Sequence, residues 1–361
     1  MFSSSVLRSQ RRHLQQQTKL KQLPFLSSNS FGPQQQRLLP LQIKMSTISS
    51  VTSSHYGNHS EAGSYENAYF YEPGAYMEHL VQLCRNRLQI RKQNQKQERQ
   101  RKHCILDIGG GTGNFAQILV QNDDDSRIVV IDPFLDPITT TTITTAESSG
   151  DDYNNDIVSF IKAPAEDFLT LPSSSDDNYI DDDWRTNIID REYEGYDQLL
   201  LKEVIHHFNE NDRTDIFRGM REGIRQRSSL SPSHPSILII TRPHIDIDYP
   251  LWDEAKEVWK KNQPSIHKIE NELNDAGFRN ILWNVESYPC CITLKRWQYM
   301  IQSRFWSTFS NFTDDELEEA CKKIADKAKV DDQNGNKDDD HDDDDDVILR
   351  FEDRLIFLTA S

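Results

Sequence analysis

The chain has few cysteines and no long apolar run, and both absences narrow its class. Its 361 residues include five cysteines, an odd number without a C-x-x-C pair. This usage argues against a disulfide framework and against a zinc site, so we expect free thiols and no bound metal. No stretch of 18 apolar residues occurs, and we therefore expect no membrane span.

Acidic residues are absent from the first 60 positions and abundant afterwards. Residues 1–60 contain seven Lys or Arg; subtracting these from the net charge of −17 leaves −24 on residues 61–361. An acid-free start rich in Ser, Gln and Arg is typical of organelle presequences, so we predict a mitochondrial address, with a Gln-rich disordered extension as the alternative. Met45 offers a second start that would give a cytoplasmic form. The acidic body argues against a nucleic-acid partner.

Composition predicts one large domain with acidic additions. The main domain is expected over residues 61–330. The other segments are a targeting-like segment at 1–60, acidic insertions near 139–156 and 173–195, an acidic linker at 331–346 and the last strands of the domain at 347–361.

The most informative stretch is ILDIGGGTGNF, residues 105–115. An apolar run around Asp107 leads into three glycines, and apolar residues at helical spacing follow Gly113. This order predicts a buried strand, a glycine turn and the start of a helix. Because glycine lacks a Cβ and adopts positive φ, residues 109–111 would let a ligand lie against bare backbone beside the free N–H groups of the helix. The G-x-G-x-x-G fingerprint of dinucleotide sites is not met, since position 114 is Asn.

An acid followed by G-x-G-x-G resembles the first motif of the class I S-adenosylmethionine-dependent methyltransferases, and the chain is most similar to small-molecule, type 11-like members. The resemblance covers about residues 65–360 without the insertions, and it implies S-adenosylmethionine as the cofactor. Its implied ligands are Asp107, Gly109, Gly111 and Gly113 for the methionine end, Asp132 for the ribose, and Ala165 with Glu166 for the adenine. The alternative for Asp132, which ends the run RIVVID, is an acid that caps the turn at Pro133.

The string KEVIHH at residues 202–207 resembles the fourth-strand segment of the same family. The resemblance places Lys202 in the cofactor site and turns His206 and His207 toward the methyl-transfer region. A histidine there could act as a general base, since its pKa lies near neutral. The alternative is that one histidine packs under the next helix and the other caps it.

Four further residues are candidates for the acceptor pocket. Tyr69 belongs to a Tyr-rich segment that commonly folds over the cofactor in the family. Arg242 ends a predicted strand and could hold a substrate carboxylate, with a surface salt bridge as the alternative. Trp297 and Arg304 belong to WQYMIQSRFWS, which resembles the helical insert that roofs the acceptor pocket; core packing is the alternative.

Strands that alternate with helices predict an α/β fold: a Rossmann-like, doubly wound, mostly parallel seven-stranded sheet with an antiparallel last strand and a helical insert before it. Residues 279–293 are expected to form a strand interrupted near Pro289. Residues 295–324 are expected to be helical, with a capping box at Thr313 and Glu316 that begins a further helix. Residues 347–359 are expected to form a hairpin-like pair whose last part, 355–359, is the reversed seventh strand.

The resemblance implies direct in-line transfer of a methyl group to an acceptor. A small molecule is favoured, because the segment after the fourth strand lacks the N-P-P-[YF] string of amino-group methylators. Two rivals remain open: a nicotinamide-dependent oxidoreductase, disfavoured by Asn114, and a non-catalytic member of the fold that binds a partner through its acidic tail. The identity of the acceptor and the oligomeric state do not follow from the sequence.

Overall fold

The computed structural model describes residues 73–88, 90, 103–121, 123, 125–135, 157–169, 195–224, 235–335 and 347–361. The predictions for the targeting segment, for Met45 and for Tyr69 lie outside these residues, as do nearly all of both acidic insertions and residues 336–346.

Seven strands form one sheet in the order β3-β2-β1-β4-β5-β7-β6. Their bounds are β1 His103–Ile108, β2 Ser126–Ile131, β3 Val158–Ile161, β4 Gln198–Lys202, β5 Ile237–Thr241, β6 Leu282–Thr293 and β7 Ile348–Ala360. Strands β1 to β5 are parallel, whereas β7 runs antiparallel to both of its neighbours. The predicted fold class is therefore confirmed. The strand order reverses between β1 and β4, and such switch points are where open parallel sheets bind ligands.

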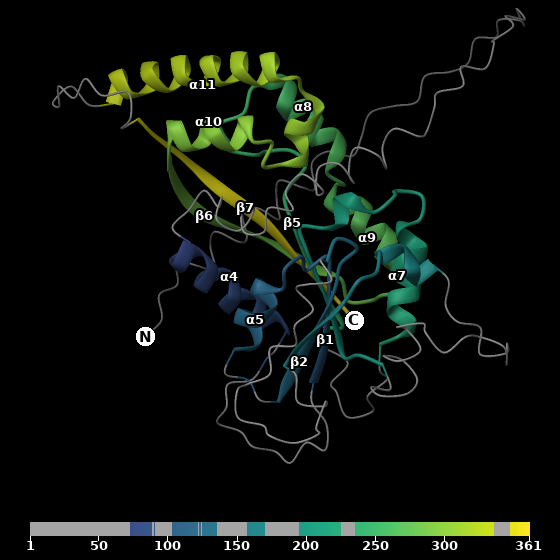
Figure 1. Cartoon of the computed structure of the whole chain (residues 1–361). Coiled ribbons are helices and arrows are strands. Elements are labelled where there is room, and N and C mark those ends of the chain that lie inside the picture. The colour runs from purple at the N-terminus through teal and green to yellow at the C-terminus, as the bar shows by residue number, and fades with distance from the viewer. Residues whose placement is uncertain are drawn as a thin grey trace, which may run out of the picture. The chain divides into compact units, whose positions relative to one another are not determined.

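Helices cover both faces of the sheet, and a third group of helices lies near one end of β6 and β7 (Figure 1). Figure 1 shows α4 and α5 on one side of the sheet and α7 and α9 on the other, with α8, α10 and α11 in the third group. The bounds are α4 Pro73–Leu88, α5 Asn114–Val120, η3 Ala165–Leu169, η5 Ile205–His207, α7 Arg213–Glu222, α8 Asp253–Asn262, α9 Ile266–Asp275, α10 Leu294–Gln302, η6 Ser307–Asn311 and α11 Asp314–Gly335.

Alternate strand residues enter two different apolar clusters. Ile105, Val130 and Leu200 pack in one cluster with residues of α4, α5 and the third group of helices. Leu106 and Leu201 enter the other, with residues of α7 and α9. This alternation follows from the two-residue repeat of a strand, and burial on both faces explains the continuous apolar runs. Each such side chain stabilises the fold by about 1.5–3 kcal/mol when fully buried.

The helix ends follow local sequence signals. The predicted capping box of α11 is confirmed: Glu316 Oε2 accepts a hydrogen bond from the Thr313 N–H at 2.8 Å, and Thr313 Oγ1 accepts one from the Glu316 N–H at 3.4 Å. Gly277, with φ of +96°, follows α9 and ends it. No helix in the described part of the chain is long and apolar enough to cross a bilayer.

Two expectations for the C-terminal third are wrong. β6 is unbroken at Pro289, which pairs with Glu352 of β7. β6 is the edge strand of the sheet, and an edge strand tolerates proline because its outer side has no partner strand to which an N–H would donate. β7 is one strand of 13 residues and no hairpin, because it pairs with β6 over its length and with β5 over its last part. The stretch expected to be helical contains α10, η6 and α11; its second helix, α11, begins at the predicted capping box, and a break follows α10 where Arg304 has a φ of +54°.

Candidate active site

The turn after β1 is packed against protein at two glycines and open at a third. Gly109, Gly111 and Gly113 have φ values of +73°, +56° and +76°; Gly110, which we also expected in this region, does not. A Cβ on Gly109 would lie 2.4 Å from Val204 Cγ2, and one on Gly113 would lie 2.5 Å from Phe160 Cε1. A Cβ on Gly111 would meet no atom within 4 Å. The turn therefore offers bare backbone to a ligand at Gly111.

Asp132 follows β2 and holds the turn from its side. Its Oδ2 accepts a hydrogen bond from the Gly111 N–H at 3.0 Å, and its Oδ1 accepts one from the Phe134 N–H at 2.8 Å. Burial raises the pKa of this carboxyl, although both amide donors oppose the rise. The bond to Phe134 is the turn-capping role that we had considered as the alternative. A carboxylate has about four acceptor positions, so two remain for hydroxyl groups of a ligand.

Asp107 lies directly beneath the turn, where a Cβ on Gly110 would be 2.5 Å from its Oδ2. Burial raises its pKa to about 7; the charge of Lys202 works against this rise and that of Asp132 adds to it. Lys202 Nζ lies 5.2 Å from the centre of the Phe115 ring. Burial therefore disfavours the charged form of Asp107, and Lys202 supports it.

Ala165 and Glu166 begin η3, just after β3, at the same edge of the sheet. Ala165 is buried and Glu166 is exposed. Their contact with an adenine stays a prediction.

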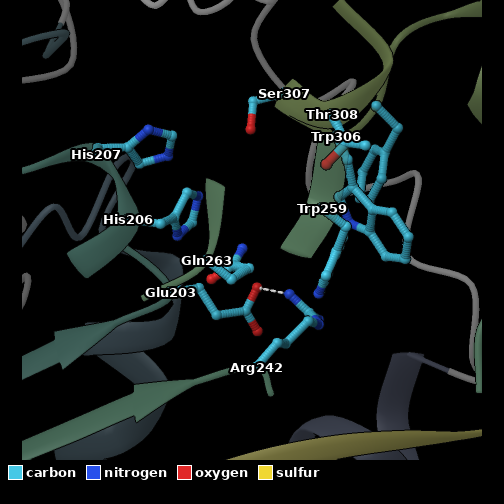
Figure 2. A pocket seen from close by; sticks show the side chains of 10 residues that line it. Glu203, His206, His207, Arg242, Trp259, Gln263, Trp306, Ser307 and Thr308 are labelled. Carbon is cyan, nitrogen blue, oxygen red and sulfur yellow. Dashed lines mark hydrogen bonds and ion pairs between the residues drawn. The ribbon is translucent and has the colours of Figure 1, made fainter. Parts of the chain in front are cut away.

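A pocket lies beyond the ends of β4 and β5 (Figure 2). Its empty volume, which includes the space at its open mouth, is about 400 Å³. Its polar lining consists of Glu203, His206, His207, Arg242, Gln263, Ser307 and Thr308. Its aromatic lining consists of Trp259, Phe305 and Trp306. Because Val204, the neighbour of Glu203, packs against Gly109, this pocket adjoins the glycine turn.

Both histidines that we predicted to face the methyl-transfer region line this pocket. Their ring centres are 3.9 Å apart. Burial, and then the neighbouring His206, lower the pKa of His207 to about 2. Burial therefore opposes a charged imidazolium at His207, and the role of a general base stays a prediction for both histidines.

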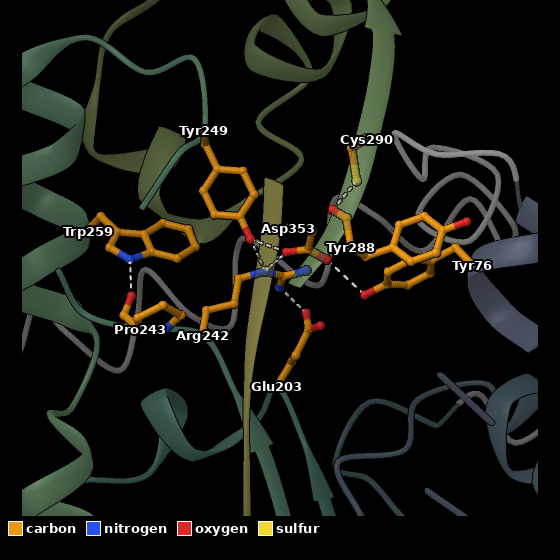
Figure 3. Close-up of polar contacts among 9 residues, drawn as sticks. All are labelled: Tyr76, Glu203, Arg242, Pro243, Tyr249, Trp259, Tyr288, Cys290 and Asp353. Carbon is orange, nitrogen blue, oxygen red and sulfur yellow. Dashed lines mark hydrogen bonds and ion pairs between the residues drawn. The ribbon is translucent and has the colours of Figure 1, made fainter. Parts of the chain in front are cut away.

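Arg242 forms ion pairs, as the alternative predicted, but in a buried polar network and not at the surface (Figure 3). Its Nε donates to the Tyr249 hydroxyl at 2.8 Å and to Asp353 Oδ1 at 3.4 Å, and its Nη1 donates to Glu203. The Tyr249 hydroxyl donates to Asp353 Oδ1, and the Tyr76 hydroxyl donates to Asp353 Oδ2 at 2.8 Å. No sequence motif identifies Tyr249 or Asp353 as members of this network, because the partners lie up to 277 positions apart.

Glu203 has a second unusual feature, a φ of +56°. Residues other than glycine avoid this region, and such backbone strain is concentrated at functional sites. This positive φ at a non-glycine position gave no signal in the sequence.

The other two predicted pocket residues lie elsewhere. Trp297 is fully buried in the core, and its Nε1–H donates to the Pro250 carbonyl at 2.9 Å. Arg304 forms an ion pair with Asp314 at 2.7 Å. Neither is among the lining residues, whereas Trp306 from the same string is. Helical spacing alone could not separate the core residue from the lining residue.

Comparisons with known proteins find a likeness of architecture. No family model and no curated protein sequence matches the chain. Among solved structures, the chain is similar to the cyclopropane synthase MmaA2 from Mycobacterium tuberculosis, with 13% identity, coverage of 85% of this chain and 98% of that one, and a TM-score of 0.42. It is also similar to an S-adenosylmethionine-dependent methyltransferase from Archaeoglobus fulgidus, with 10% identity, coverage of 79% and 94%, and a TM-score of 0.36.

Likenesses this distant carry no argument about function. The sheet itself has the strand order and the antiparallel seventh strand of a Rossmann-like, doubly wound fold.

Proposed function

We propose that the protein is an S-adenosylmethionine-dependent methyltransferase that acts on a small-molecule acceptor by in-line displacement. The observation that carries this proposal is the open backbone at Gly111, which lies between two carboxyl side chains at the switch point of a parallel sheet. The residues fit the cofactor, because a position without a Cβ accommodates its methionine part and carboxylates suit its hydroxyl and ammonium groups.

Each residue of the turn would have a defined part in binding. Asp107 and the turn amides would hold the methionine end, Asp132 the ribose hydroxyls, and Ala165 with Glu166 the adenine. When bound, the cofactor supplies a methyl group on a positively charged sulfur. The charge of Lys202 favours the ionised form of Asp107, since it works against the rise in the pKa of that carboxyl.

The pocket next to the turn would hold the acceptor. Glu203 and Arg242 form its polar floor, and Trp259 and Trp306 contribute an aromatic wall. Alignment of the acceptor and exclusion of water are the main requirements of a direct transfer, so a general base is not essential to this proposal.

Calorimetry with the full chain tests the cofactor assignment. S-adenosylmethionine should bind and NAD should not, and Asp132→Ala should weaken binding by about 1–3 kcal/mol, the cost of hydroxyls left without an acceptor. The exposed Asp326 gives a matched control, since Asp326→Ala should leave the affinity unchanged. Preferential binding of NAD would favour the oxidoreductase rival. Binding of neither ligand would favour the non-catalytic one, whose proposed acidic contact lies outside the described residues.

We also propose that residues 1–60 direct the protein to mitochondria. The full chain and a chain that starts at Met45, each fused to a fluorescent protein, should localise to mitochondria and to cytoplasm, respectively. The same location for both would overturn this assignment.

A further inference from the structure

The network around Arg242 contains more negative than positive charge. Asp353 is fully buried and accepts hydrogen bonds from two tyrosine hydroxyls and from Arg242. A carboxylate has enough acceptor positions for all three donors. Burial is the main reason why the pKa values of Tyr76 and Tyr249 lie well above the usual value, so both stay neutral donors. Burial also works to raise the pKa of Glu203, but Arg242 and Lys202 outweigh it and hold that pKa below its usual value. Two carboxylates therefore share one guanidinium.

The glycine turn holds a separate group of charges, Asp107, Asp132 and Lys202, and the charge of Lys202 also lowers the pKa of Glu203. In the pocket itself, Glu203 is the one carboxyl among the lining residues of the described chain. Glu203 shares the guanidinium of Arg242 with Asp353, so the pocket offers a carboxylate whose ion-pair partner is divided between two acids.

The pocket offers a ligand a carboxylate more readily than a cation. Glu203 reaches the pocket with 15% of its side chain exposed. The Trp259 and Trp306 rings are buried and packed edge to face, and the Arg242 guanidinium lies 5.6 Å from the centre of the Trp306 ring, so these rings form a packed wall beside Glu203. Arg242 is a poor anchor for an anion here, because its Nε and Nη1 already serve Tyr249, Asp353 and Glu203.

We propose that the methyl acceptor is an amine that enters this pocket as a cation and is held by Glu203. The inference rests on the proposed function and names its substrate class. The ammonium first loses a proton to water at the open mouth. The nitrogen lone pair then forms the new N–C bond while the C–S bond of the donor breaks and its electron pair stays on sulfur. The methylated product is again a cation, and the donor leaves without its sulfonium charge.

Three ligands of one shape test the charge preference. Choline is a cation, 3,3-dimethylbutan-1-ol is its neutral carbon isostere, and 3,3-dimethylbutanoate is a related anion. Each is titrated into the full-length protein in the presence of S-adenosylhomocysteine, and tryptophan fluorescence reports occupancy because Trp259 and Trp306 line the pocket. Choline should bind about tenfold more tightly than the alcohol, and the anion most weakly. Equal binding of choline and the alcohol, or tighter binding of the anion, would overturn the proposal.

A substitution assigns the preference to Glu203. Glu203→Gln should lower the affinity for choline about tenfold and leave that for the alcohol unchanged. Glu318→Gln, which removes the same charge from an exposed pair with Lys322, should change neither. A preference for choline that survives in Glu203→Gln would remove Glu203 from the site. If this variant does not fold, the three-ligand series on the wild-type chain decides alone.

The outcome separates the two proposals. Binding of S-adenosylmethionine without a preference for choline refutes the amine acceptor and leaves the methyltransferase assignment intact. A preference for choline without binding of S-adenosylmethionine refutes the methyltransferase and leaves a cation-binding pocket.

Discussion

Two glycines of the same turn should respond differently to the same substitution. Gly111→Ala adds a methyl group that meets no protein atom within 4 Å, whereas Gly113→Ala pushes one to 2.5 Å from the Phe160 ring. Both positions have positive φ, so the backbone strain is similar in the two variants. Comparison of the two variants therefore distinguishes the effect of filling a ligand site, at Gly111, from the effect of overlap with the protein core, at Gly113.

The magnitudes follow from these contacts. Positive φ costs an alanine about 1–2 kcal/mol, and the reduced freedom of the unfolded chain offsets about 0.4–1 kcal/mol of this. Gly111→Ala should therefore destabilise the fold by roughly 0–1.5 kcal/mol. The overlap with Phe160 adds an overpacking cost of about 1–3 kcal/mol to Gly113→Ala.

Urea denaturation followed by tryptophan fluorescence measures the stability of both variants, and calorimetry measures their affinity for S-adenosylmethionine. Gly111→Ala should unfold almost like the wild type and bind the cofactor at least about tenfold more weakly, because its methyl group occupies the cradle. Wild-type affinity in this variant would refute the cradle. Equal stability of the two variants would refute the packing of Gly113 on Phe160.

Three further outcomes follow from the buried groups and from the sheet order. The pKa of Asp107 is about 7 in the folded protein against an ordinary 3.8, so its protonated form stabilises the fold, fully below pH 3.8 and progressively less as the pH rises toward 7. The unfolding free energy of Asp107→Asn minus that of the wild type should therefore grow by up to about 4 kcal/mol between pH 4 and pH 8, and a constant difference would contradict the burial of this carboxyl. Asp353→Ala leaves three buried donors without their acceptor and should cost about 3–5 kcal/mol in urea denaturation, against under about 0.5 kcal/mol for Asp326→Ala; a loss below 1 kcal/mol would mean that water replaces the carboxylate. A chain that ends at Ile324 lacks β7 and should show no cooperative unfolding transition, and a sharp transition would show that β1 to β5 are stable alone.

The parallel half of the fold could be predicted because its signals are local. Continuous apolar runs mark β1, β2, β4 and β5, and the glycine turn follows β1 within a few residues. The antiparallel part was harder to predict, since β6 and β7 lie more than 50 positions apart and their register depends on each other. Pro289 led us to expect a break, but proline interrupts the pairing of a central strand and not that of an edge strand such as β6.

The candidate site also has a part that could be predicted from local sequence and a part that could not. Asp107 and Asp132 could be selected because each ends a strand at the expected spacing. Their protein contacts could not, because the bond from Asp132 to Gly111 depends on the folded turn. The network of Arg242 joins α4, the ends of β4 and β5, the segment before α8 and β7, and no short motif contains it.

The place of β7 has a consequence for synthesis in the cell. This strand lies between β5 and β6 but is translated more than 50 residues after β6. Until the ribosome has released Ala360, a nascent chain exposes the edges of β5 and β6 that β7 will later join. Unpaired edges of this kind are sites of aggregation, so chaperones should bind the chain during its translation and leave it once the strand has inserted.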